Sequence, residues 1–568
     1  MPSWIASMRS QATLKKYCVV IAIGLLVLLA YGPSFRAGFI WDDDVHVTGN
    51  AQMRDFQGFF RIWTTPEAVY YPLTSTFFWI ETHLWGNKPF GYHLFNLIVH
   101  IANSFLVYLI LQSFFEFFIA FFAALLFAVH PIQVESVAWI TELKNLLSAF
   151  FCLMSALFYL LYSGTMTRGR GKRYLAALFF FILAVLSKSQ VVMLPVVFLF
   201  FHWFKKDKPL PGQLKALAPF FLISLLASCW TIWEQTFHSG AFGNDWTAPF
   251  LERLLRSAHI LWFYAAKIAF PHPLMFLYPK WTTDVHSFRS YFPLFLLMLT
   301  TLFLTLLRKK IAPRVLFCLL YFAVMLFPFL GFFNIYFMKY SFVGDHFVYH
   351  AGLGLMVVFA CFINGIRKPK TLKWFMMALT VLVLTGMTYV HALTFRSSET
   401  LWRDTANKNP RAWLAFHNLA TVLYSRWDVM GAIRNYELAL KIRPDFAEAH
   451  SNLSYLLAST HQGDLAIAHG LAAIRLQPNS AASHLNLGIA FHESGDIKNA
   501  EEQYKKAISL SPGLDAAYAD LADLWAPQNR KEALRWLKAG LHQNPNSPLL
   551  RGKLHRILEE QEIQDRSA

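Results

Sequence analysis

The chain has 568 residues, of which 56% are apolar, 17% aromatic and only 15% charged, a composition that excludes an ordinary soluble globular protein. Its 51 Lys and Arg residues exceed its 34 Asp and Glu residues by 17, but the basic residues gather in short loops between apolar segments, which argues against nucleic acid as a partner. The five cysteines all lie within apolar stretches, so they indicate neither a disulfide framework nor a thiolate metal site.

Apolar segments that could cross a membrane recur up to about residue 392. We predict eleven spans, at 17–35, 91–113, 117–131, 143–163, 174–188, 190–204, 214–233, 291–307, 311–330, 347–366 and 372–392. The first has a basic start and an apolar core like a signal peptide, but so many spans follow it that we expect a retained helix. The sequence thus predicts an all-α, polytopic membrane body over residues 1–392.

Basic residues fall at alternate turns of this body and set its orientation. The positive-inside rule assigns five regions to the cytoplasm, and these contain Lys15, Lys16, Arg168, Arg170, Lys172, Arg173, Lys205, Lys206, Lys208, Arg308, Lys309, Lys310, Arg314, Arg367, Lys368, Lys370 and Lys373. The loops 36–90, 234–290 and 331–346 and the tail from 393 onward are therefore predicted to be extracytoplasmic. Segment 249–270 carries several charges, so we expect an interfacial or re-entrant helix there.

Three consecutive carboxylates, Asp42, Asp43 and Asp44, follow the first span. Like charges so close raise one another's pKa, and such a cluster can provide a general base or hold a divalent cation; a solvated acidic turn is the alternative. Other ionisable groups lie at span ends, where a functional role competes with snorkelling or helix capping: His130, Glu135, Glu142, Lys144, Lys188, Asp345 and His346.

The tail contains a helical repeat. Pro410, Pro444, Pro478, Pro512 and Pro545 are spaced 34, 34, 34 and 33 residues apart, the period of tetratricopeptide repeats. We predict a connecting half-repeat at 393–410, four repeats at 411–545 and a cap at 546–568, forming a solenoid whose groove binds peptide.

One asparagine recurs at the same place in three of these repeats, as Asn418, Asn452 and Asn486. An amide there can hydrogen-bond an extended peptide backbone, or bond within and between the repeats.

No Gly-rich phosphate loop, nucleophile elbow or HExxH sequence occurs. Outer carboxylates, basic groups at membrane level and a peptide groove on one side favour a different chemistry. A carboxylate would accept the proton of a protein hydroxyl while Lys or Arg binds the phosphate of a lipid-linked donor.

Several motifs resemble the transmembrane and tetratricopeptide repeat-containing (TMTC-like) O-mannosyltransferases. The resemblance covers almost the whole chain in the same order, and the combined set is specific although each motif alone is weak. The motifs are Phe39-Ile40-Trp41-Asp42-Asp43, Tyr71-Pro72-Leu73-Thr74, Pro89-Phe90-Gly91-Tyr92-His93, Ala128-Val129-His130-Pro131, Glu135-Ser136-Val137-Ala138-Trp139, Ser187-Lys188, Asp345-His346 and Leu401-Trp402-Arg403-Asp404.

The resemblance implies a membrane glycosyltransferase of the GT-C architecture with an extracytoplasmic active site. It implies a polyprenyl-phosphate sugar donor, undecaprenyl or dolichyl phosphate mannose, and an inverting reaction on Ser or Thr of exported proteins. The family's acidic pair maps onto Asp42 and Asp43; we expect Asp43 to be the base and Asp42 to orient the acceptor or bind a cation, with Asp44 an additional acid.

The remaining site residues follow from the same comparison. Lys144 and Lys188 are expected to contact the donor phosphate, with His130, Glu135, Asp345 and His346 around the pocket and with Asn418, Asn452 and Asn486 holding the acceptor. Where animal members have an Arg-x-Asp arrangement, this chain has Leu143-Lys144-Asn145, which leaves the sugar open. The short repeat array resembles the bacterial branch and favours the bacterial cytoplasmic membrane, the endoplasmic reticulum being the eukaryotic alternative.

Two other classes of function compete with this prediction. A non-catalytic membrane scaffold would use the spans as an anchor and the repeats to recruit a partner for envelope assembly. A transporter is disfavoured because charges in the middle of spans and broken helix pairs are scarce.

Overall fold

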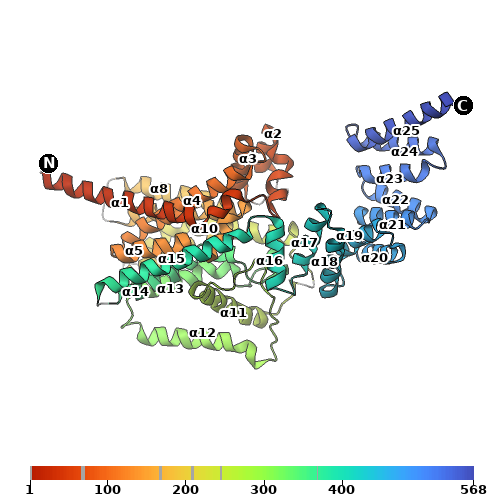
Figure 1. Cartoon of the computed structure of the whole chain (residues 1–568). Coiled ribbons are helices and arrows are strands. Elements are labelled where there is room, and N and C mark those ends of the chain that lie inside the picture. Colours follow the sequence, from red (N-terminus) through yellow and green to blue (C-terminus); the bar gives the residue numbers. More distant parts are fainter. Residues whose placement is uncertain are drawn as a thin grey trace. The chain divides into compact units, whose positions relative to one another are not determined.

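The computed structural model describes residues 3–65, 71–164, 169–205, 210–243, 246–366 and 369–567. All regular elements in these ranges are helices (Figure 1), which confirms the all-α class. The chain forms two compact units, Met1–Asn409 and Pro410–Ala568. Of the basic residues that define the predicted orientation, Arg168, Lys206, Lys208, Arg367 and Lys368 lie outside the described residues.

The first unit contains sixteen α-helices among its described residues. They are α1 (Ser3–Ala30), α2 (Phe56–Thr64), α3 (Pro72–Trp85), α4 (Pro89–Gln112), α5 (Phe117–Val129), α6 (Val134–Ala138), α7 (Leu143–Ser163), α8 (Arg170–Ser187), α9 (Leu194–Lys205), α10 (Leu210–Phe237), α11 (Phe250–Ala269), α12 (Phe288–Leu307), α13 (Pro313–Leu326), α14 (Gly352–Asn364), α15 (Lys370–Thr394) and α16 (Ser398–Lys408).

The core of this unit surrounds α5, whose residues are all apolar and almost all buried. A helix that is apolar on every side must be surrounded, and α5 contacts α1, α4, α14 and α15. It ends at Val129, because Pro131 cannot continue the helix and disfavours a helical conformation at His130, and the chain bends by 51° into the short segment Pro131–Ala138. This bend directs the following segment, which carries Glu135, toward the polar interior.

Each of the eleven predicted spans falls on a helix of the structure. Five helices are long and apolar enough to cross a membrane by themselves, and the bent pair around Pro131 makes up to six; shorter apolar helices cover Lys16–Ala30, Ser189–Phe204, Pro313–Phe329 and Gly352–Asn364. The chain is thus a membrane protein by its helices, while the number eleven stays a prediction. Segment 249–270 forms α11, which contacts α12 at the outer edge of the unit (Figure 1).

The second unit is built from helix pairs, as the period of 34 residues predicts. The helices are α17 (Trp413–Ser425), α18 (Val429–Ile442), α19 (Ala447–Ser459), α20 (Gly463–Leu476), α21 (Ala481–Glu493), α22 (Ile497–Leu510), α23 (Asp515–Trp525), α24 (Arg530–Gln543) and α25 (Pro548–Ser567). Pro444, Pro478, Pro512 and Pro545 each lie two residues beyond the second helix of a pair, where a residue that cannot continue a helix is expected.

The boundary between the units lies later than the end of the predicted membrane body at residue 392. Helix α16, expected to be a connecting half-repeat, belongs to the first unit. Its Trp402 packs edge-to-face on Trp41 and Phe276, and Asn409 donates to the carbonyl oxygen of Leu277 at 3.0 Å. Because Trp402 contacts Trp41, α16 supports the segment that carries the acidic residues.

Candidate active site

A cavity of about 470 Å³ lies within the first unit. Part of its polar lining comes from four stretches of chain that are far apart in sequence: the segment after α1, the start of α7, the segment after α8, and the 3-10 helix η10 (Asp345–Val348). These contribute Asp42, His46, Glu142, Lys144, Lys188, Gln190 and His346. Helix α10 adds further polar side chains, among them Glu234 and Gln235, and aromatic and aliphatic side chains from residues 327–340 form much of the remaining wall.

The turn that carries Asp42 has an unusual backbone. Trp41 has a φ of 43°, a left-handed conformation that is costly for a bulky residue and persists only where its surroundings enforce it. Its ring stacks on Trp139, with 5.5 Å between centroids. The adjacent Asp43 carboxylate accepts hydrogen bonds from the backbone N–H groups of Ile40 at 2.8 Å and Thr141 at 3.0 Å.

The three acidic residues consequently have different surroundings. Asp42 lines the cavity. Asp43 is fully buried and accepts the two backbone hydrogen bonds described above. Asp44 is exposed and accepts a hydrogen bond from Thr48 at 2.9 Å. Asp43, the residue expected to be the base, is not among the residues that line the cavity, whereas Asp42 is. Among the described residues, no three His, Cys, Asp or Glu side chains are grouped so that they could hold a metal ion.

Desolvation raises the pKa of the Asp42 carboxyl above its ordinary 3.8, and the nearby Lys144 ammonium partly opposes this rise. The same burial lowers the pKa of His46 to about 3, with the Lys144 charge acting in the same direction. At neutral pH the His46 ring is therefore uncharged. A carboxylate whose pKa is raised accepts a proton more readily than an ordinary one.

Two lysines converge on one carboxylate in the cavity wall. Glu142, 1% exposed, pairs with Lys144 Nζ at 2.9 Å through one oxygen and with Lys188 Nζ at 3.1 Å through the other. Lys144 also lies over the Trp139 ring, 5.3 Å from its centroid. The group carries one net positive charge and both its lysines line the cavity, so it can bind an anion without a large desolvation cost for either ammonium.

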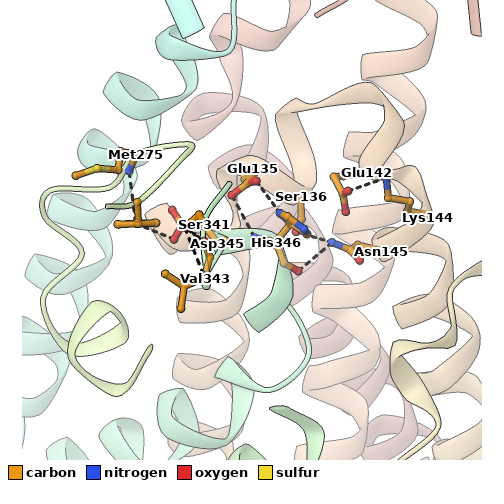
Figure 2. Close-up of polar contacts among 12 residues, drawn as sticks. Glu135, Ser136, Glu142, Lys144, Asn145, Met275, Ser341, Val343, Asp345 and His346 are labelled. Atoms are coloured by element: carbon orange, nitrogen blue, oxygen red, sulfur yellow. Dashed lines mark hydrogen bonds and ion pairs between the residues drawn. The ribbon is translucent and has the colours of Figure 1, made fainter. Parts of the chain in front are cut away.

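His346 lines the cavity, and hydrogen bonds to Glu135 and Asn145 fix its orientation. Its Nδ1 lies 2.6 Å from Glu135 Oε1, its backbone N–H donates to Glu135 Oε2 at 3.3 Å, and Asn145 Nδ2 donates to its carbonyl oxygen at 3.0 Å. Figure 2 shows His346 between Glu135 and Asn145. A carboxylate at Nδ1 favours the proton on that nitrogen, so Nε2 is the free acceptor.

Three expected pocket residues, His130, Glu135 and Asp345, lie outside the lining. His130 Nδ1 accepts from the N–H of Ile132 at 3.2 Å and thereby caps the bend after α5, while its Nε2 lies 2.9 Å from the carbonyl oxygen of Ile268 in α11. Both ring nitrogens therefore have partners. Asp345 accepts from the Tyr278 hydroxyl at 2.9 Å, and burial, with the Glu135 charge, raises its pKa well above its usual range. Glu135 likewise contributes only by holding His346.

Sequence reasoning did not assign a role to Glu142, His46 or Gln190. Gln190 is 4% exposed and lines the cavity, and neither its amide nitrogen nor its amide oxygen has a hydrogen-bond partner among the described residues. A buried amide without partners is costly unless a bound group satisfies it, so Gln190 is a candidate ligand contact. In the sequence, the only feature that could have indicated Gln190 as a site residue was its position two residues after Lys188.

In the second unit, two of the three recurring asparagines bond to neighbouring repeats. Asn452 Nδ2 donates to the Tyr436 hydroxyl at 3.3 Å, and Asn486 Nδ2 donates to the Ser451 carbonyl oxygen at 3.1 Å. Asn418 Nδ2 is buried without a hydrogen-bond partner in the part of the chain that the structure describes. The amide donors of Asn452 and Asn486 therefore stabilise the solenoid, which was the alternative interpretation of this pattern.

Comparisons with known proteins agree with the order of these elements. A family model described as dolichyl-phosphate-mannose-protein mannosyltransferase matches residues 66–233, and a tetratricopeptide repeat model matches residues 481–513. Human protein O-mannosyl-transferase TMTC3 is 23% identical over an alignment covering 93% of this chain and 64% of the relative. The chain is thus similar in sequence to this O-mannosyl-transferase over most of its own length.

Other relatives match more locally. A Caenorhabditis elegans protein O-mannosyl-transferase, F38B6.6, is 31% identical over 24% of this chain and 22% of the relative. This chain spans less than two thirds of the length of these curated relatives. Among solved structures, the tetratricopeptide repeat protein TTC0263 of Thermus thermophilus is 23% identical, covers 32% of this chain and 96% of its own length, and has a TM-score of 0.26, an overlap too small to support an inference.

The buried Asp43 gives a prediction about stability and pH. Burial raises the pKa of Asp43 from 3.8 to about 7, although the N–H groups of Ile40 and Thr141 lower it. Between these values the folded chain holds a proton that the unfolded chain has lost, so the free energy of unfolding should fall as pH rises, by at most about 1.4 kcal/mol per pH unit. Asp43→Asn removes the titration, and we expect a flatter profile of thermal midpoint against pH.

The exposed Asp44 provides the control for this measurement, because Asp44→Asn makes the same chemical change one residue further along the chain. Its pH profile should follow that of the unmodified chain. Parallel profiles for Asp43→Asn and the unmodified chain would show that Asp43 is not a buried titrating group.

Proposed function

We propose that this chain transfers a sugar, with mannose the first expectation, from a polyprenyl-phosphate donor to Ser or Thr hydroxyls of exported proteins. The observation that carries the proposal is the composition of the cavity: Asp42 and the two lysines paired with Glu142 line one space whose other walls are largely apolar. A base, an anion site and apolar walls are the parts that a lipid-phosphate donor and a hydroxyl acceptor require.

The proposed reaction is a direct displacement in which Asp42 acts as general base. The Asp42 carboxylate takes the proton of the acceptor hydroxyl while the hydroxyl oxygen forms a bond to the anomeric carbon of the sugar. The bond between that carbon and the phosphate oxygen breaks, and its electron pair leaves with the polyprenyl phosphate. The outcome is inversion, and the proton ends on Asp42.

Lys144 and Lys188 would stabilise the charge that develops on the leaving phosphate. Their ammonium groups are already held by Glu142 at 2.9 Å and 3.1 Å, so little reorganisation is needed when the donor binds. The GT-C architecture implied by the resemblance is consistent with this division of roles, because it combines a membrane-embedded lipid site with a polar site at the membrane surface.

Polar side chains around the sugar would determine its identity. Gln190, with both amide atoms unpartnered among the described residues, and His346, held by Glu135, are the groups best placed to hydrogen-bond sugar hydroxyls. The repeat unit is proposed to bind the acceptor protein. Its groove as a whole would make the contacts, because the side-chain N–H groups of Asn452 and Asn486 are already used between repeats. We favour the bacterial cytoplasmic membrane, with the repeats on its outer side.

The full chain reconstituted in liposomes with a polyprenyl-phosphate mannose and a mixture of envelope proteins tests the proposal. Mass spectrometry should find hexose added to Ser or Thr residues, and the lipid phosphate should be released in equal amount. A chain that binds the donor yet releases no lipid phosphate with any acceptor would contradict the enzyme and favour the membrane scaffold.

A further inference from the structure

Helix α2 exposes a row of aromatic side chains, Phe56, Phe60 and Trp63. They are 63%, 55% and 46% exposed, and because they are separated by four and three residues they lie on one face of the helix. Gln57 and Arg61 are exposed on the adjoining face. An aromatic face beside a polar face is typical of helices that lie in the surface of a membrane.

The buried side of α2 fixes the direction of this aromatic row. Gly58 and Ile62 are buried, and Gly58 lies so close to the carbonyl group of Gln52 that the space cannot hold a side chain. Asp55 caps the start of the helix by accepting from the N–H of Gly58 at 2.6 Å. With this side packed inward, the aromatic row points away from the rest of the first unit.

Helix α2 is attached to α3, and Figure 1 shows the two side by side. Trp79 Nε1 donates to the carbonyl oxygen of Asp55 at 2.8 Å. Trp63 Nε1 donates to Thr76 Oγ1 at 3.0 Å. The rings of Phe59 and Trp79 pack edge-to-face with 5.4 Å between their centroids. The position of α3 relative to the membrane therefore sets that of α2.

The candidate spans that contain α4 and α7 begin at the same end of the first unit. Asn96 Nδ2 donates to the carbonyl oxygen of Trp139 at 3.3 Å. Seven residues further along both segments, Asn103 Nδ2 donates to the carbonyl oxygen of Leu146 at 2.9 Å. The two spans are therefore parallel, and their first residues lie at one surface of the membrane.

Helix α3 runs along this surface, because both of its ends are held there. Near its start, Thr74 donates to the carbonyl oxygen of Ser187 at 2.9 Å, and the next residue, Lys188, pairs with Glu142 at the beginning of the α7 span. At its other end, only residues 86–88 separate α3 from α4. The 14 residues of α3 cover about 21 Å between these two points.

The apolar surface of α4 continues into this region. Leu84 and Phe90, on either side of the junction between α3 and α4, are 67% and 53% exposed. The medium beside the aromatic row is thus the one that surrounds the spans. We infer that α2 is embedded in the surface of the lipid bilayer, with Phe56, Phe60 and Trp63 at the boundary between headgroups and acyl chains.

The same contacts fix the depth of the acidic segment. Helix α3 contacts η2 (Asp44–Thr48), which begins two residues after Asp42. An embedded α2 therefore holds the cavity residues of this segment at the membrane surface. The inference itself does not depend on the proposed sugar transfer.

Spin labels at two neighbouring positions test the inference. In the full chain with its five cysteines replaced by alanine, Phe60→Cys places a label on the aromatic row and Gln57→Cys places the matched control on the polar face. Both positions are exposed in the structure. In phosphatidylcholine bilayers, the label at 60 should be several-fold more accessible to oxygen, which concentrates among acyl chains, than to a water-soluble nickel chelate. The label at 57 should show the opposite preference.

Two other outcomes overturn the inference. Equal and high accessibility to both reagents at positions 57 and 60 would place α2 in water. Protection of position 60 from both reagents would show that protein, either a second copy or a partner, covers the aromatic row. Only a label that oxygen reaches and the nickel chelate does not reach supports a helix embedded in the bilayer.

A second measurement uses the natural cysteines and serves if the cysteine-free chain does not fold. Phosphatidylcholine with a photoreactive group near the top of its acyl chain should label the tryptic peptide Asp55–Arg61, and the variant Phe56→Ser with Phe60→Ser should lower this labelling several-fold while labelling of the spans is unchanged. Labelled spans with an unlabelled Asp55–Arg61 peptide in the unmodified chain would overturn the inference. Sugar transfer is not measured, so failure here is separate from failure of the proposed function.

Discussion

Replacing Asp42 with asparagine should slow sugar transfer by about a hundredfold to ten-thousandfold, the usual contribution of a general base. The amide has nearly the same shape as the carboxylate but cannot take the acceptor proton. Since Asp42 is the acidic residue of the first loop that lines the cavity, kcat should fall while the KM for the lipid donor changes little. The measurement is release of polyprenyl phosphate from a labelled donor by reconstituted full-length chain.

The pH dependence of the unmodified chain provides a second check on Asp42. Because burial raises the pKa of this carboxyl above 3.8 and a base acts only when ionised, activity should fall on the acid side at a pH above that ordinary value. Asp44→Asn, which changes an exposed neighbour, should retain activity. If Asp43→Asn abolished transfer and Asp42→Asn did not, the sequence-based assignment of the base to Asp43 would be restored.

Much of the fold could be predicted because its signals are local. Each predicted span falls on a helix, since a run of apolar residues is sufficient to indicate a helix in a membrane. The repeat unit was equally accessible, because the prolines that follow α18, α20, α22 and α24 mark the period directly. The place of α16 was harder to predict, because its sequence is polar although the contact of Trp402 with Trp41 attaches it to the first unit.

The choice between Asp42 and Asp43 depends on long-range contacts. The direction of each carboxylate follows from the φ of 43° at Trp41 and from the hydrogen bond between Asp43 and the N–H of Thr141, 98 residues away. Neither is visible in a run of three acidic residues. The sequence indicates only that a cluster of carboxylates follows the first span, and the structure shows that Asp42 is the one that lines the cavity.

Histidines and lysines at span ends show the same ambiguity. His130 and His346 both lie in short motifs beside a helix end, but His130 bonds to Ile132 and Ile268 with its two ring nitrogens, whereas His346 lines the cavity. Lys144 and Lys188 were predicted as phosphate contacts, and the structure brings them onto the shared carboxylate of Glu142 although Lys188 is 46 residues from it. The sequence shows which residues are charged, but whether two lysines meet at one carboxylate depends on how α7 and α8 pack.

The second large effect is expected from this lysine pair. Lys144→Gln or Lys188→Gln removes one charge-assisted contact to the leaving phosphate, which is worth about 1.5–3 kcal/mol, so each should slow transfer by roughly ten- to a hundredfold. Each single variant leaves Glu142 paired with the other lysine. Removing both would leave a carboxylate that is 1% exposed without a partner, a change that destabilises a protein by about 3–5 kcal/mol, so the single variants are the informative ones.

A contact with phosphate also predicts weaker product inhibition. Polyprenyl phosphate carries the charge that the lysines stabilise, so its inhibition constant should rise in each variant by about the same factor as the rate falls. Lys88→Gln removes one charge from an exposed residue of the first loop and should change neither quantity. A lysine variant that loses activity while polyprenyl phosphate inhibits it as strongly as before would exclude direct phosphate binding and reduce that lysine to a structural partner of Glu142.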